Sequence, residues 1–151
     1  MFHLNGTEPN VTQLMGTHGY MPPEYVHDGN LSVKYDVYSF GVLILEIISG
    51  KRVTAVFNQY GGDHHLLTHA WHVWLSGNYG ELADPYLRGQ FEEAELMKRI
   101  QIALLCVEKN PDHRPFMQEI TMMLSKDGAV THDPQQPAYL DIQLGANRPV
   151  N

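Results

Sequence analysis

The sequence predicts a mainly α-helical fold, and two features of the chain carry that prediction. Residues 37–48 are almost all apolar, and the run is bounded by Ser32, a good helix N-cap, and by Gly50, a good helix stop. Apolar residues then recur at helical spacing in two segments between residues 91 and 125. With 151 residues, of which 43% are hydrophobic, the chain suits one globular domain.

The first 29 residues show no sustained hydrophobic period. They are rich in Gly, Pro, Thr and Asn, and we expect a long loop with at most a short helix at residues 23–26. A structureless loop of that length is usually functional or belongs to an incomplete domain.

A buried central helix is expected over residues 35–49, because a segment that is apolar all round is normally covered on every side. The run is also β-branched enough to resemble a strand, but its length and the glycine at its end favour a helix. Gly41 costs a helix about 1 kcal/mol relative to Ala, so we expect another element to approach closely there.

Three further helices should pack around this hub. The periodicity places them near residues 65–77, 94–108 and 115–125, with Pro115 at the first position of the last one. From residue 126 the chain turns to Asp, Gly, Pro and Gln, which predicts a flexible C-terminal tail over residues 126–151.

The charge balance excludes some classes of partner. Ten Lys and Arg against 17 Asp and Glu give a formal net charge of −7, which argues against nucleic-acid binding. No segment is long and apolar enough to predict a membrane span. The single cysteine, Cys106, cannot form an internal disulfide, which favours a reduced compartment, and its place among core positions predicts an inert buried thiol.

Three segments together point to a family. Residues 16–25 read GTHGYMPPEY, residues 36–43 read DVYSFGVL, and residues 110–115 read NPDHRP. In that order they resemble the C-terminal half of a eukaryotic protein kinase domain, and the motif sequences are most similar to those of plant receptor-like serine/threonine kinases of the cysteine-rich class. The resemblance implies the C-lobe of the protein-kinase-like fold, lacking the N-lobe and the catalytic loop. It makes residues 1–125 a partial kinase domain from the activation segment onward.

The motifs that carry phosphoryl transfer in this family are not in the sequence. There is no Gly-rich loop, no Val-Ala-Ile-Lys strand, no His-Arg-Asp and no Asp-Phe-Gly. Intact members use ATP and Mg²⁺, held by groups that those motifs supply. We therefore expect a truncated, pseudokinase-like serine/threonine kinase domain that is inactive alone and takes no cofactor. In the parent family the kinase domain lies in the cytoplasm, on the cytoplasmic side of the plasma membrane.

The resemblance also assigns roles to residues of the activation segment. The loop that receives the substrate residue after the phosphoacceptor corresponds to Gly16, Thr17, Gly19 and Tyr20, with Thr17 marking a Ser/Thr enzyme. Phosphorylation candidates in the same segment are Thr7 and Thr12, since a phosphate there can order a loop against an Arg. The alternative for Thr17 is that it only shapes a turn.

Three charged residues are assigned structural roles by the same resemblance. Glu24 and Arg114 would form a buried ion pair that joins the activation segment to the last helices; the alternative is two unrelated surface charges. Asp36 would contact the missing catalytic loop from the start of the central helix; the alternative is a role at the helix N-terminus.

Two other functions remain open from the sequence. The chain could be a non-catalytic interaction module or decoy that pairs with full-length receptor-like kinases, or binds their substrates, through apolar surface on the central helix. It could instead be a metal-binding helical domain, because His65, His69 and His72 share one helix face. A solvated histidine face is the simpler interpretation of that spacing. Trp71 and Trp74 are expected to pack in the core.

Overall fold

The computed structural model describes residues 19–58 and 64–139, and the described part of the chain is helical, with isolated β-bridges but no strand. Its α-helices are α1 (Pro23–Asp28), α2 (Val33–Ser49), α3 (Leu66–Ser76), α4 (Glu93–Cys106) and α5 (Met117–Leu124). Short 3₁₀ turns follow α3 at Tyr79–Glu81 and Pro85–Leu87, and another precedes α5 at Pro111–His113. The mainly α fold class is confirmed.

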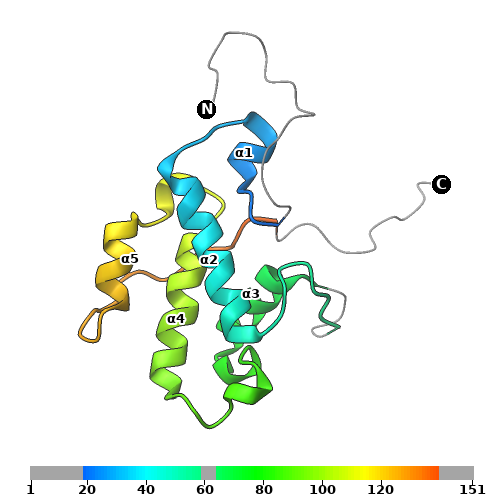
Figure 1. Cartoon of the computed structure of the whole chain (residues 1–151), viewed down its shortest axis with the longest axis vertical. Coiled ribbons are helices and arrows are strands. Elements are labelled where there is room, and N and C mark those ends of the chain that lie inside the picture. The colour runs from blue at the N-terminus through cyan, green and yellow to red at the C-terminus, as the bar shows by residue number, and fades with distance from the viewer. Residues whose placement is uncertain (1–18, 59–63, 140–151) are drawn as a thin grey trace, which may run out of the picture.

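Helices α2 and α4 form the centre of the molecule and pack along each other (Figure 1). Helix α3 packs against both of them, and α5 packs against α4 on the opposite side. The short helix α1 sits near the first turns of α2. The predicted hub is therefore present, with the other helices arranged around it.

The ends of α2 follow from two local signals in the sequence. The Oγ atom of Ser32 accepts a hydrogen bond from the backbone N–H of Lys34 at 3.1 Å, which satisfies one of the free donors of the first turn. Gly50 adopts φ 67°, and its N–H donates to the carbonyl oxygen of Glu46 at 2.8 Å. The helix begins two residues before the predicted start and ends where predicted.

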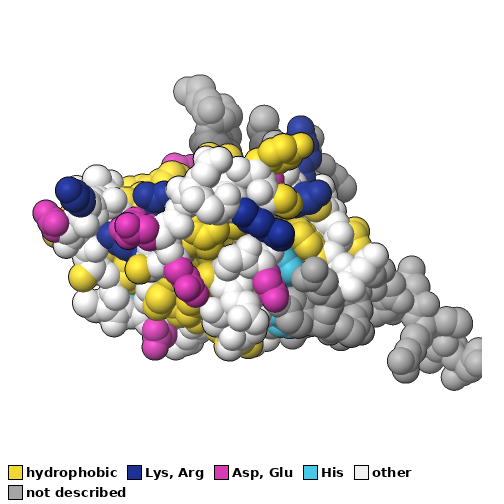
Figure 2. All heavy atoms as spheres, turned by 90° about the horizontal axis from the view of Figure 1, so that it is seen from below, with side chains coloured by type: hydrophobic (Ala, Val, Ile, Leu, Met, Phe, Trp, Pro, Cys, Tyr) yellow, Lys and Arg dark blue, Asp and Glu magenta, His cyan; other side chains and the backbone are white. Residues whose placement is uncertain are grey.

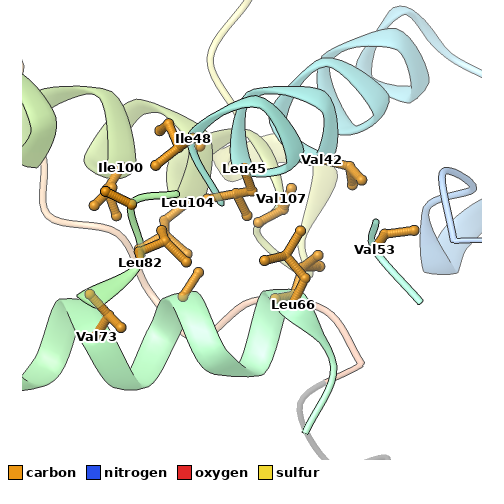
Figure 3. Packing of buried hydrophobic residues seen from close by; sticks show 14 of the residues in the cluster. Val42, Leu45, Ile48, Val53, Leu66, Val73, Leu82, Ile100, Leu104 and Val107 are labelled. Carbon is orange, nitrogen blue, oxygen red and sulfur yellow. The ribbon is translucent and has the colours of Figure 1, made fainter. Parts of the chain in front are cut away.

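The main core lies where α2, α3 and α4 meet. Leu45 of α2, Leu66 of α3 and Leu104 of α4 are fully buried and point toward one another (Figure 3). Gly41 lets α4 approach, because a Cβ atom placed there would lie 2.6 Å from the Cβ of Cys106 and 2.9 Å from the carbonyl oxygen of Ala103. The close approach expected at this glycine is confirmed.

The start of α5 differs from the prediction. The helix begins at Met117, after Pro115, because Arg114 and Phe116 are both extended, with ψ 139° and 158°. A residue that precedes proline is driven out of the helical region, and Arg114 must keep its side chain directed inward. The Glu119 carboxylate instead accepts from the N–H of Phe116 at 3.2 Å and stabilises this later helix start.

Residues 126–139 of the predicted flexible tail make specific contacts with α4 and the residues that follow it. Ala138 is fully buried, and its N–H donates to the carbonyl oxygen of Val107 at 3.1 Å. The side-chain amide of Gln101 donates to the carbonyl oxygen of His132 at 2.8 Å. The composition of this segment, rich in Pro and Gln, is typical of a mobile segment, and composition does not reveal such contacts. Residues 140–151 lie outside the described part.

The surface shows no accumulation of one charge on the face seen from below, where acidic, basic and hydrophobic side chains are interspersed (Figure 2). None of the helices in the described ranges combines the length and the apolarity needed to cross a bilayer.

Candidate functional site

Gly19 and Tyr20 are the residues of the predicted substrate loop that the structure describes, and Tyr20 contacts the central helix. The carbonyl oxygen of Tyr20 accepts from the hydroxyl of Ser39 at 2.8 Å, and its phenol donates to Glu46 Oε1 at 2.5 Å. The hydrogen bond to Glu46, followed by burial, raises the pKa of Tyr20 above its ordinary value. Both ends of Tyr20 are thus tied to α2. We call Tyr20, Ser39 and Glu46 the loop anchor.

Glu46 also joins a second segment to the loop anchor. Its Oε2 atom accepts from the backbone N–H of Val53 at 2.9 Å. Gly19 adopts φ 93°, and a Cβ atom there would lie 2.5 Å from Val53 Cγ1, so a side chain is excluded at this position. The carboxylate of one residue therefore fixes the spacing between the loop and the turn that follows α2.

Glu24 and Arg114 are brought together as a bidentate ion pair. The Nη1 atom of Arg114 lies 2.6 Å from Glu24 Oε1, and Nη2 lies 2.9 Å from Oε2. The side chain of Arg114 is fully buried and that of Glu24 is 13% exposed. Two parallel charge-assisted bonds of this kind are stronger and more directional than a single contact. They attach α1 to the segment before α5.

The remaining donors of Arg114 are also used. Its Nε atom donates to the carbonyl oxygen of Glu108 at 2.8 Å, Nη1 also to that of Lys34 at 3.3 Å, and Nη2 also to that of Lys109 at 3.4 Å. The guanidinium lies 5.1 Å from the ring centre of Tyr38. A buried guanidinium needs an acceptor for each of its N–H donors, because each unpaired donor would carry a desolvation cost.

The segment after α5 reaches the same region. Glu108 Oε1 accepts from the N–H of Gln135 at 2.9 Å, and the hydroxyl of Tyr139 donates to the carbonyl oxygen of Met21 at 3.0 Å. Met21 follows Tyr20 of the loop anchor directly in the sequence. Burial raises the pKa of Tyr139 to about 12, so its hydroxyl remains a donor at neutral pH. The C-terminal segment therefore braces the chain immediately after the predicted substrate loop.

Other predicted site residues lie apart from these contacts. Asp36 is exposed in the first turn of α2, and within the described ranges it makes no hydrogen bond or ion pair. That placement agrees with an acidic residue near a helix N-terminus. The remaining predictions, Gly16, Thr17, Thr7 and Thr12, lie outside the described residues.

The histidine face is not a solvated stripe. His69 is 2% exposed, and its ring stacks on Phe57 at a centroid distance of 4.1 Å and an angle of 7°. The rings of His64 and His72 meet edge to face at 4.9 Å. Burial lowers the pKa of both His69 and His72. These rings pack as aromatic side chains, and periodicity could not show that Phe57 would cover them.

The described ranges contain no group of three or more His, Cys, Asp or Glu residues arranged to hold a metal ion. The metal-binding alternative therefore has no support from the geometry, and the described residues offer no such group for the Mg²⁺ of a nucleotide. Cys106 is fully buried, and burial raises the pKa of its thiol to about 12, in agreement with an inert thiol. Trp71 and Trp74 pack against the main core, as predicted.

Three residues of the candidate site were not singled out from the sequence: Ser39, Glu46 and Lys34. Glu46 carried a signal, since it is the one acidic or basic residue within the apolar run. A charge inside a buried helix needs a partner, and that requirement could have pointed to it. Lys34 is 8% exposed and its ammonium donates to the carbonyl oxygen of Arg114, a contact that no local pattern encodes.

Comparisons with known proteins agree with this geometry. The profile of the protein kinase domain family matches residues 3–124. The chain is 45% identical over 138 residues to cysteine-rich receptor-like protein kinase 21, and 42% identical over 139 residues to cysteine-rich receptor-like protein kinase 34, both of Arabidopsis thaliana. These matches cover 91% and 92% of the chain but 20% and 21% of the relatives, so the chain spans about a fifth of their length.

A solved structure is also similar to this chain. The structure of the pseudokinase domain of BIR2, an immune regulator of the RLK/Pelle family, matches with a TM-score of 0.62 and 33% sequence identity. The match covers 72% of this chain and 32% of the solved chain. The helices described above are thus similar to one part of that larger domain.

Proposed function

Because this chain belongs to the protein kinase domain family, we propose that it forms the substrate-loop side of a receptor-like serine/threonine kinase C-lobe. By itself it does not transfer phosphate. The observation that carries the proposal is the loop anchor, in which Tyr20 is held by Ser39 and Glu46 of the central helix α2. A loop that must present a peptide backbone at a fixed place gains from attachment to a long helix that packs in the core.

The residues of this chain contribute positioning rather than chemistry. The loop anchor fixes the end of the substrate loop, and the Glu24–Arg114 pair fixes the short helix that follows it. In the family template a Lys binds the nucleotide phosphates, an Asp and an Asn hold Mg²⁺, and a second Asp accepts the proton of the substrate hydroxyl, and all four lie in motifs that this sequence does not contain. Positioning and charge stabilisation make up most of phosphoryl-transfer catalysis, so the chain alone should have no measurable activity.

The first experiment tests inactivity directly. The purified chain is incubated with labelled ATP, Mg²⁺ and a serine/threonine peptide mixture, and incorporation is compared with a boiled control. We expect equal counts in both samples. Incorporation above the boiled control contradicts this part of the proposal.

A second experiment tests the positioning role. Residues 3–124 replace the matching segment of an active cysteine-rich receptor-like kinase, and the chimera should phosphorylate Ser and Thr. Tyr20→Phe in the chimera should raise KM for peptide and leave KM for ATP unchanged. The matched control is Tyr86→Phe, since Tyr86 is 89% exposed and remote from the loop anchor. An equal effect of the two variants contradicts the role of Tyr20.

A second candidate function is pairing with other receptor-like kinases on the cytoplasmic side of the membrane. It is favoured by one observation: Leu43 and Ile47, four residues apart on α2, are 46% and 68% exposed. In a pull-down with the kinase domain of a relative, Ile47→Glu should abolish retention. The control is Leu75→Glu on α3, where Leu75 is 65% exposed. Lack of retention of the unmodified chain at micromolar concentration excludes this function.

A further inference from the structure

A groove lies between α5, the 3₁₀ turn that precedes it and the segment after α5. Its volume is about 1100 Å³. Ligand pockets for small molecules usually enclose roughly 300–1,000 Å³, so this groove has room for several side chains of a peptide. The loop anchor is not part of its lining, whereas Arg114, the partner of Glu24, forms part of its wall.

The walls of the groove are fixed by contacts within the chain. On one side the segment 126–135 is held by the Gln101 side-chain bond to the carbonyl oxygen of His132 and by the Gln135 N–H bond to Glu108. Lys98 Nζ donates to the carbonyl oxygen of Ser125 at 3.0 Å, where this segment leaves α5. The groove is therefore preformed, which reduces the ordering cost of binding.

Apolar side chains are available along the groove. Met122 is 72% exposed and Phe116 is 53% exposed, while Leu105 and Met123 are more deeply placed beside them. Methionine is flexible and polarisable, so a surface that presents it adapts to apolar side chains of different shapes. These residues can accept an apolar anchor from a partner.

The charge of the groove decides which partner suits it. Four lining carboxylates are exposed: Asp112, Glu119, Asp127 and Asp133. The lining cations are already engaged, because Arg114 is buried against Glu24, and the Lys34 ammonium donates to a backbone carbonyl and lies 4.0 Å from the ring centre of Phe116. The rim therefore presents negative charge.

We propose that this groove docks a basic amphipathic peptide segment of a partner protein. Apolar side chains of the segment would lie on Met122 and Phe116, and its Lys and Arg side chains would face the exposed carboxylates. An anionic lipid surface or a nucleic acid would be repelled by the same rim. This docking is independent of the proposed kinase function, since it uses neither the substrate loop nor the exposed face of α2.

The test selects peptides without assuming their sequence. A display library of short random peptides is panned against the full chain, and selected peptides are labelled and titrated by fluorescence anisotropy. The groove variant carries Asp112→Asn, Asp127→Asn and Asp133→Asn, whose side chains make no hydrogen bond or ion pair with the described residues. The control variant carries Asp28→Asn, Glu92→Gln and Glu93→Gln, which removes the same charge from exposed sites elsewhere.

We expect enrichment of peptides that combine Lys or Arg with apolar residues, with binding that weakens as salt is raised. The groove substitutions should weaken peptide binding about tenfold, which is the combined effect expected from the loss of three exposed charge pairs. The control substitutions should leave binding unchanged. Met122→Ser should also weaken it. The proposal is overturned by enrichment of no basic peptide, by equal loss in both charge variants, or by binding of phosphatidylserine vesicles in place of peptide.

Discussion

Removing the charge of Glu24 should strongly destabilise the fold, although the substitution is nearly isosteric. In Glu24→Gln the side chain keeps its shape and one acceptor oxygen. Arg114, which is fully buried, then keeps its positive charge without a carboxylate partner, and only neutral acceptors remain: the amide oxygen and the backbone carbonyls of Lys34, Glu108 and Lys109. Breaking one partner of a buried pair costs about 3–5 kcal/mol, and the retained oxygen puts the expected loss near the lower end, about 3 kcal/mol.

That loss is a large share of the stability of a domain, which is typically about 5–15 kcal/mol. With an m-value near 1.5 kcal/mol/M, the urea midpoint should fall by about 2 M. The assay is urea unfolding followed by far-ultraviolet circular dichroism and by the fluorescence of Trp71 and Trp74. Coincident transitions with the two probes would justify a two-state free energy of unfolding.

The control is a glutamate in an ion pair that is exposed to solvent rather than buried. Glu95 pairs with Arg99 at 3.5 Å on α4, and these side chains are 48% and 57% exposed. Glu95→Gln should cost only about 0.3–0.5 kcal/mol. The reasoning is refuted if Glu24→Gln lowers the free energy of unfolding by no more than Glu95→Gln does.

The remaining predictions concern packing, pH and the C-terminal segment. Gly41→Ala should lower the free energy of unfolding by about 1–3 kcal/mol, because overpacking against Cys106 and Ala103 exceeds the gain in helix propensity; a more stable variant would contradict the close approach. Burial holds the pKa of His69 below its ordinary value of 6.5, so the unfolded chain binds the proton more readily. Stability from this group should be complete above about pH 6.5 and fall as the pH is lowered below it, and His69→Asn should make urea midpoints less dependent on pH over that range. Tyr139→Phe should cost about 1 kcal/mol through loss of the bond to Met21, whereas an unchanged urea midpoint would indicate that the C-terminal segment does not brace the chain.

The helices were predictable because their signals are local. Ser32 and Gly50 mark the ends of α2 with their own backbone and side-chain chemistry, and periodic apolar residues mark α3 and α4. The start of α5 was displaced because Phe116 is extended, with ψ 158°, and its N–H donates to the Glu119 carboxylate. The prediction relied on the preference of proline for the first helical position and did not use this capping contact.

The site was accessible from the sequence only in part. Glu24 and Arg114 were identified through a family resemblance, and the structure shows why the two are placed together. The part played by Glu46 was missed, because its partners at Tyr20 and Val53 come from opposite sides along the chain. The contacts of segment 126–139 were not predicted, because those of Ala138 and Tyr139 depend on where α4 ends and on where Met21 lies.

The bidentate contact of Arg114 also sets an order of events in folding. Bringing together two residues 90 positions apart carries a loop-closure cost of about 4 kcal/mol in chain entropy. The acceptors around Arg114 come from α1, from the first turn of α2 and from the end of α4, so the guanidinium finds its full set of partners only after α2 and α4 have met. The contact should therefore be absent from the transition state. Weakening it should speed unfolding and leave the refolding rate unchanged, so that the attachment of α1 governs the lifetime of the native chain rather than its rate of formation.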